Sequence, residues 1–194
     1  MAWSKNGTTT LSSAGDSQVL SITNTEFSLI LNHELASGQL AGRINYDNDS
    51  GSKYAQRQSF NGAADTTLTS QTVVYWSAND SVSDDQFIVC YLCNIVGEEV
   101  LGMFFGVSHG GAGAANDPDR RENVHKFTDT TALTSIDVSN AGTGDFDTGS
   151  NLTALNGDTT ESLVLGNIQS GSRMEVTDTR KIYYWNGSTF TEEA

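Results

Sequence analysis

Proline, cysteine and basic residues are scarce in this 194-residue sequence. Proline occurs once, at Pro118, whereas Gly occurs 19 times and Ser, Thr, Asn and Asp are abundant. Hydrophobic residues make up 37% of the chain, which is below the usual share for globular proteins. Frequent Gly, Asn and Asp interrupt long helices and mark turns. The composition therefore favours many short strands over long helices.

The shortage of positive charge excludes one class of partner. Ten Lys and Arg face 24 Asp and Glu, so the formal net charge is -14. A field of this sign repels nucleic acid and anionic membrane surfaces, and we expect neither as a partner. No run reaches the ~20 apolar residues of a membrane helix, and residues 1–17 lack the apolar core of a secretory signal. We therefore expect synthesis in the cytoplasm.

The two cysteines, Cys90 and Cys93, lie three residues apart in the apolar run FIVCYLCNIV. In a strand they point to opposite faces and are poorly placed to bond each other. We expect buried free thiols, with a redox or metal role as the alternative. The histidines at 33, 109 and 125 show no ligand spacing for zinc.

Short apolar blocks separated by Gly or Asn/Asp/Ser clusters predict about a dozen strands and an all-β sandwich or barrel. The expected strands are residues 18–23, 26–32, 39–46, 53–60, 72–76, 85–96, 99–108, 122–128, 133–138, 161–166, 173–177 and 181–185. The most apolar pair, 85–96 and 99–108, predicts a central antiparallel hairpin. Its first strand is apolar on both faces, which suits a covered strand or a subunit interface.

Two long polar segments, residues 109–122 and 140–158, predict loops, and loops of this length are usually functional or mobile. We expect a β-sandwich domain over residues 1–166 and a C-terminal extension over 167–194. The extension contains KIYYWNGSTF, in which Asn186-Gly187 predicts a two-residue turn that pairs Trp185 with Ser188.

The same hairpin supplies the first candidate binding residues. With that turn, Tyr183, Trp185 and Phe190 share one face, and an isolated hairpin must dock on something to be stable. Packing is the simpler explanation of these rings. The alternative is an exposed platform for sugar faces or for a neighbouring subunit.

A second candidate is the run DPDRRENVHK, which gathers Arg120, Arg121, His125 and Lys126 in a strongly acidic chain. Such a cluster can hold a neighbour that carries the same acidic surface. Local salt bridges to Asp117, Asp119 and Glu122 are the simpler explanation.

The sequence contains few motifs that would indicate catalysis or metal binding. The paired carboxylates of sandwich-fold glucanases, G-x-S-x-G elbows, Walker loops and H-E-x-x-H are absent from the sequence, and we expect no enzyme activity and no cofactor. YDNDSGSKY, at 46–54, has the D-x-D spacing of calcium loops at Asp47 and Asp49 but departs from the EF-hand pattern. A looser calcium site between loops stays open beside an ordinary turn.

Three stretches resemble viral proteins. MAWSKNGTTTL and GSKYAQRQSFNGAAD resemble uncharacterised β-rich proteins of marine phages and archaeal viruses. GSRMEVTDTRKIYYWNGSTF resembles a C-terminal module of phage structural and tail-associated proteins, with Glu175, Asp178, Thr179, Arg180 and Lys181 matching its motif.

The resemblance implies a virion-associated protein with a jelly-roll-like β-sandwich and no enzyme activity. We therefore expect a virion structural protein on the particle exterior, as a capsid decoration, fibre or spike. The partners expected are other copies of the chain, with a trimer favoured, and other virion proteins. Acidity also favours the exterior, away from packaged genome. Two alternatives remain open: a carbohydrate-binding module that recognises host glycans, and a self-assembling extracellular filament subunit.

Overall fold

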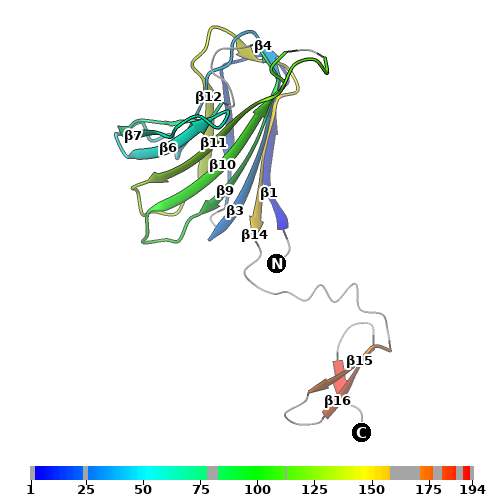
Figure 1. Ribbon diagram of the computed structural model, residues 1–194. Helices are drawn as coiled ribbons and strands as arrows, with labels where there is room; N and C mark the ends of the chain where they lie inside the picture. Colours follow the sequence, from blue (N-terminus) through cyan, green and yellow to red (C-terminus); the bar gives the residue numbers. More distant parts are fainter. Residues whose placement is uncertain are drawn as a thin grey trace. The chain divides into compact units, whose positions relative to one another are not determined.

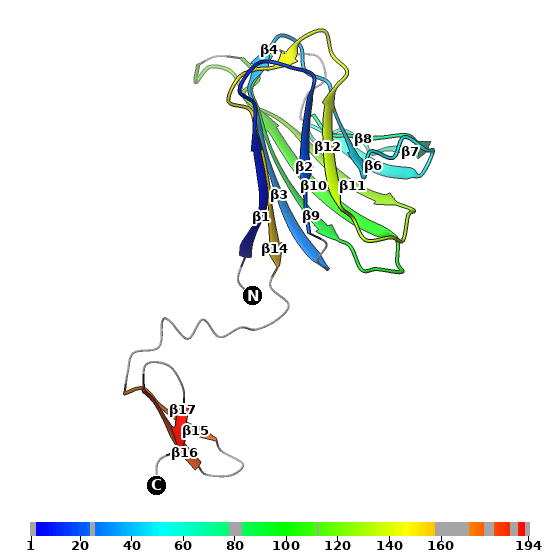
Figure 2. The same cartoon turned by 180° about the vertical axis from the view of Figure 1, so that it is seen from behind.

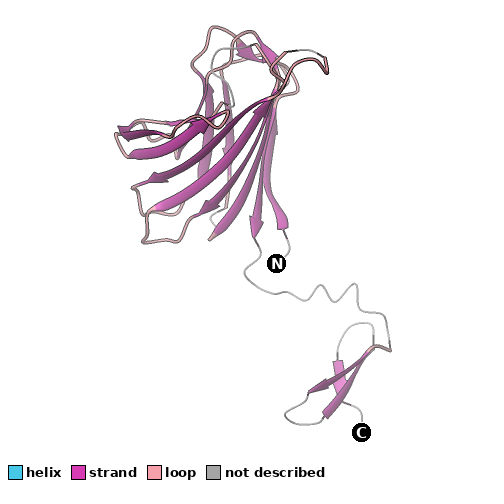
Figure 3. Ribbon diagram, viewed as in Figure 1, coloured by secondary structure: helices cyan, strands magenta, loops and turns pink. Residues whose placement is uncertain are grey.

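The computed structural model describes residues 3–23, 26–77, 83–111, 113–157, 171–176, 181–186 and 190–192. All regular elements in these ranges are strands, and their pairings are antiparallel (Figure 3). The all-β prediction is confirmed. The chain divides into two compact units, residues 1–157 and 158–194. The boundary expected at residue 166 and the strand expected at 161–166 lie outside the described residues.

Unit 1 is a β-sandwich of one long and one short sheet. The long sheet has the order β1-β14-β3-β9-β10-β11-β6-β7, formed by Trp3–Thr10, Asn151–Gly157, Phe27–Glu34, Gln86–Cys93, Val100–Ser108, Asp119–Phe127, Tyr54–Phe60 and Thr66–Gln71. The short sheet has the order β2-β12-β5-β8, formed by Ser17–Ser21, Ser135–Asn140, Gly42–Tyr46 and Val74–Tyr75. A small pair joins β4 (Ala36–Ser37) to β13 (Asp145–Phe146).

The short sheet covers one face of the long sheet. Figure 1 views the long sheet from its other face, and Figure 2 views the domain from the side of the short sheet. The core between them is closed by large side chains with almost no exposure, namely Trp76, Tyr46, Tyr54, Phe104, Phe127, Phe146, Ile30, Leu40, Ile44, Ile88, Leu133 and Ile136. The β-sandwich prediction is confirmed at this level. The two sheets have eight and four strands. The finer expectation of a jelly-roll topology stays a prediction.

The predicted central hairpin is present as β9 and β10. The strands pair in register from Leu101 opposite Cys93 to Ser108 opposite Gln86. Strict alternation turns Ile88, Cys90 and Leu92 into the core and their neighbours outward, as the sequence predicts. The two thiols are free and lie on opposite faces, with Cys90 buried and Cys93 half-buried.

The prediction of one long loop over residues 140–158 is wrong, because the segment contains β13 and the seven-residue strand β14. β14 lies between β1 and β3, where only Leu152 and Ala154 supply its buried side chains. Its outward side bonds through hydroxyls and amides, with Thr8 Oγ1 2.6 Å from Thr153 Oγ1 and Asn151 Nδ2 donating to Thr10 Oγ1 at 2.7 Å. A polar strand of this kind has no apolar alternation to reveal it.

Unit 2 contains a three-stranded sheet, β15-β16-β17, formed by Arg173–Val176, Lys181–Trp185 and Phe190–Glu192. Trp185 pairs with Phe190 and Tyr183 with Glu192. The predicted register, with Trp185 opposite Ser188, is therefore wrong, because four residues rather than two separate the paired positions. The shift is by two, so Tyr183, Trp185 and Phe190 still share one face.

Candidate functional site

The largest exposed apolar surface in the described part of the chain lies on the long sheet, on the side away from the short sheet. We call it the outer face. It consists of the outward side chains of β3, β9, β10 and β11, namely Phe27, Leu29, Leu31, Phe87, Val89, Tyr91, Cys93, Leu101, Met103, Phe105, Val107 and Val124. Its eight most exposed members are between 37% and 54% exposed.

Strand register makes the outer face continuous. One row across the sheet runs from Leu29 through Tyr91 and Met103 to Val124, because each residue is the cross-strand partner of the next. The adjacent row runs through Val89 and Phe105. Side chains in such rows stand about 5 Å apart and touch. The central strands are therefore apolar on both faces, and among the described residues of unit 1 only the inner face is covered.

Part of the outer face is hollowed into a groove of about 650 Å³. Its apolar wall comes from Phe27, Leu68, Tyr91, Leu101, Met103 and Val124, which belong to five strands of the long sheet. The cations Arg57 and Lys126 lie at its edge. The groove is thus a shallow apolar depression with charge only at its border.

Three ion pairs lie along the border of the outer face, on the side of β6 and β11. Lys126 Nζ lies 2.7 Å from Glu99 Oε2, Arg120 Nη1 lies 3.4 Å from Glu122 Oε1, and Arg57 Nη1 lies 4.0 Å from Asp65 Oδ2. Each of these pairs is exposed, so each adds little to stability. Their consequence is electrostatic: the border is locally balanced although the chain carries a net charge of -14.

The predicted basic cluster is divided by the pleat of β11. Arg120 and Lys126 point outward, whereas Arg121 and His125 point into the sandwich and are 8% and 5% exposed. The Arg121 guanidinium lies over the Phe60 ring, 5.9 Å from its centre. Arg120 pairs with Glu122, as the simpler explanation of the run expects. The four residues therefore form no single basic surface.

The aromatic residues of the C-terminal hairpin differ in exposure. Trp185 is 3% exposed and packs against Phe190, with ring centres 5.1 Å apart. Tyr183 and Phe190 are half-buried. The exposed large hydrophobic side chains of β16 are instead Ile182 and Tyr184, on the opposite face. Trp185, the largest ring of the expected sugar platform, is thus buried within unit 2.

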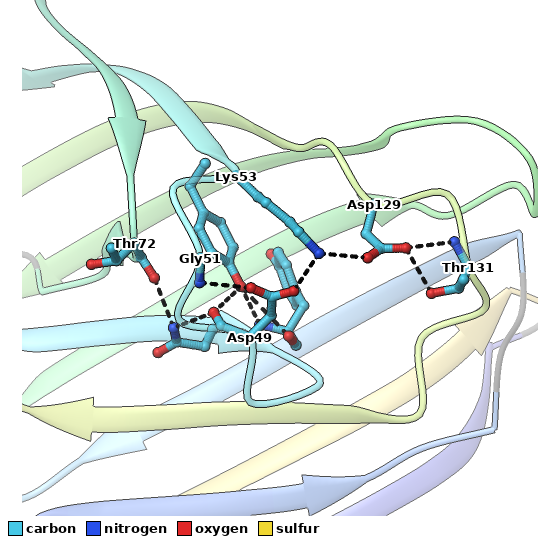
Figure 4. A network of polar contacts seen from close by, with 9 residues as sticks. Asp49, Gly51, Lys53, Thr72, Asp129 and Thr131 are labelled. Carbon is cyan, nitrogen blue, oxygen red and sulfur yellow. Dashed lines mark hydrogen bonds and ion pairs between the residues drawn. The ribbon is translucent and has the colours of Figure 1, made fainter.

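The acidic loop after β5 is held by a lysine (Figure 4). Lys53 Nζ donates to Asp49 Oδ2 at 2.6 Å and to Asp129 Oδ2 at 2.9 Å, while Asp49 Oδ1 accepts from the Gly51 amide. Asp47 Oδ1 accepts from Thr134 and Ser135. These bonds tie the loop to the start of β12. Among the described residues, no group of three or more His, Cys, Asp or Glu side chains converges as metal ligands would.

Lys53→Met is expected to lower the melting temperature most between about pH 4 and pH 10. Bonding to Lys53 lowers the pKa of Asp49 and Asp129 below 3.8, and those bonds raise the pKa of Lys53 above 10.5. The stabilisation is therefore lost as pH falls below 3.8 or rises above 10.5. Melting curves across this range, with Lys5→Met as the control, test the expectation. A melting-temperature difference that stays constant with pH would contradict it.

A buried polar network crosses the core below the outer face. Tyr46 Oη lies 2.7 Å from His125 Nε2, and His125 Nδ1 lies 3.2 Å from Asn123 Oδ1. Because Asn123 donates through its Nδ2 to Gln56, its oxygen accepts, so His125 donates from Nδ1 and accepts the Tyr46 hydroxyl at Nε2. Burial lowers the pKa of His125 to about 4, so the ring is neutral at pH 7.

Comparison with known proteins finds no matching family model, no matching curated protein and no matching solved structure. None of the described residues forms a helix of the length and hydropathy needed to cross a membrane.

Proposed function

We propose that the protein is a non-enzymatic structural protein of a virus particle, which lies on the particle exterior and assembles through its β-domain. The observation that carries the proposal is the outer face, where central strands present a continuous apolar surface. Exposed patches of this kind mark contact surfaces in soluble proteins. A protein whose main surface feature is a large apolar sheet face fits assembly better than catalysis.

The viral part of the proposal is supported by the sequence. The two ends of the chain resemble phage and archaeal virus proteins, and an acidic chain of this charge is suited to a position away from packaged genome. Its partners are then other copies of the chain and other proteins of the particle. The threefold assembly favoured by the resemblance remains part of the proposal.

Immunogold labelling of virus particles tests this proposal. Antibodies raised against the purified full chain are expected to label the surface of intact, nuclease-treated particles of a virus whose genome encodes this chain. Particles opened by detergent serve as the control for internal antigen. Label that appears only after opening, or only in the particle-free fraction, would reject a position on the particle exterior.

The two alternatives make different predictions. A glycan-binding module needs exposed rings, and on β16 the exposed ring belongs to Tyr184. Glycan-array binding that is lost in Tyr184→Ala, with the fold retained, would favour this alternative. A filament subunit would form open polymers of the purified protein, which electron microscopy detects directly.

A further inference from the structure

We propose that the outer face is a twofold interface, on which the same face of a second copy of this chain packs. The inference rests on the proposed self-assembling function and deepens it by naming the contact surface and the partner. In such a contact the long sheets of two copies stack face to face, and each copy supplies the same residues. The four-layered pair then covers the central strands on both sides.

The area of the outer face fits this partner. A Phe or Tyr side chain presents roughly 150–250 Å² when fully exposed, and Leu, Met and Val lie toward or below the lower end of this range. Eight side chains at 37–54% exposure, with the half-buried members between them, therefore present on the order of 700 Å². The largest patch on an ordinary monomer is about 300–600 Å². A stable dimer buries about 800 Å² on each partner, close to the area available here.

The charge distribution also favours a second copy. Two chains of net charge -14 repel each other at most orientations. The border of the outer face is different, because Arg57, Arg120 and Lys126 are balanced by Asp65, Glu122 and Glu99. The centre of the face carries no charged side chain. Two copies that approach through this face therefore repel each other less than two copies that approach through acidic surface.

The remaining described surface indicates that the partner uses the same face. Elsewhere on unit 1, the exposed large apolar residues are Trp3, Val19, Ile95 and Val96, which do not form a second sheet face of comparable area. In unit 2, the exposed large apolar side chains described are Ile182 and Tyr184. A surface with so few apolar residues would leave most of the outer face uncovered, so among the described surfaces the identical face is the one of matching area.

The twofold contact limits the number of chains in the assembly. A closed pair contains two chains, and a pair combined with the expected threefold axis contains six. A closed trimer of three chains contains no twofold axis. The mass in solution therefore separates this contact from a threefold ring in which the outer face contacts a different surface.

The test is the mass of the purified full chain, measured by light scattering, for the wild type and for Met103→Lys. Met103 lies at the centre of the outer face and is 48% exposed in the single chain, so the substitution leaves the core intact. Lysine reduces the net negative charge, so added repulsion between the acidic chains cannot explain dissociation. Burying its ammonium between two sheets is expected to raise the dissociation constant at least ~100-fold.

Val19→Lys is the matched control, because it places the same charge on an exposed position of the short sheet. It is expected to keep the wild-type mass. Circular dichroism and melting temperature establish that both variants are folded. Cys93, half-buried on the outer face, is an internal probe whose alkylation is expected to be slow in the wild type and at least ~10-fold faster in Met103→Lys.

Each outcome decides the proposal. Two or six chains in the wild type, dissociation in Met103→Lys and exposure of Cys93 support it. An oligomer that Met103→Lys leaves intact overturns the twofold face but not self-assembly. A three-chain assembly overturns it as well. A monomer also overturns it. In that case, protection of Cys93 would indicate that residues of the same chain cover the outer face. Surface labelling of particles tests the viral role separately.

Discussion

Between pH 6.5 and about 4, the free energy of unfolding of unit 1 is expected to fall by roughly 3 kcal/mol because of His125. Burial lowers its pKa to about 4 in the folded chain, against 6.5 when exposed. The unfolded chain therefore binds a proton first, so this stabilisation is complete above pH 6.5 and is lost as pH falls toward 4. Each unit of pH across this window corresponds to about 1.4 kcal/mol.

The surroundings of His125 explain why the neutral ring is preferred. Its ring is stacked with Tyr46 and lies 6.4 Å from the Phe104 ring, centre to centre. Burial also raises the pKa of Tyr46, so the tyrosine stays a hydroxyl that donates to Nε2. Gly102 approaches the same edge of the imidazole from β10, where a Cβ would overlap the ring. A charged imidazolium would therefore lie among aromatic rings and backbone with little exposure to solvent, which disfavours the charged form.

His125→Gln is the control for this prediction. A glutamine can accept from Tyr46 and donate to Asn123 through its amide, but it does not titrate. Both proteins share the change in net charge as surface carboxylates are protonated. Chemical denaturation at several pH values is therefore expected to show a steeper loss in the wild type between pH 6.5 and 4. Parallel curves for the two proteins would show that His125 is not the group responsible.

The sequence predicts the core of unit 1 better than its edges. β9 and β10 are long, apolar and alternating, so their pairing and the direction of Cys90 and Cys93 follow from the two-residue period. β1, β7 and β14 are polar strands that depend on pairing with their neighbours, and Thr and Asn side chains bond across β1 and β14. Alternation of apolar residues cannot detect them, although the threonines of residues 8–10 are a weak signal.

The candidate site is foreseeable only in part. Two apolar faces on residues 85–96 predict either a second covering layer or a subunit interface, and the short sheet covers only one of them. The outer face itself depends on register across four strands, which brings Leu29 and Val124 into one row with β9 and β10. The predicted basic cluster does not form, because residues that are adjacent in the sequence, such as Arg120 and Arg121, point to opposite sides of a strand.

Trp185→Ala is expected to unfold unit 2 while leaving unit 1 intact. Trp185 is 3% exposed, and truncating a buried Trp costs about 3–5 kcal/mol. A unit of roughly 40 residues has a total stability of about 2–6 kcal/mol at ordinary values per residue. Loss of this side chain, and of its contact with Phe190, therefore removes most or all of the stability of the three-stranded sheet.

Hydrogen exchange of the backbone amides in β15, β16 and β17 measures this effect. Protection there is expected to fall at least ~100-fold in Trp185→Ala, while protection in β9 and β10 is unchanged. Tyr184→Ala is the matched control, since Tyr184 is on the same strand but 40% exposed, and it is expected to keep the protection. Retained protection in Trp185→Ala would show that Trp185 is not essential to unit 2. Because loss of Trp185 disturbs folding, Tyr184→Ala is also the variant that separates glycan recognition from stability.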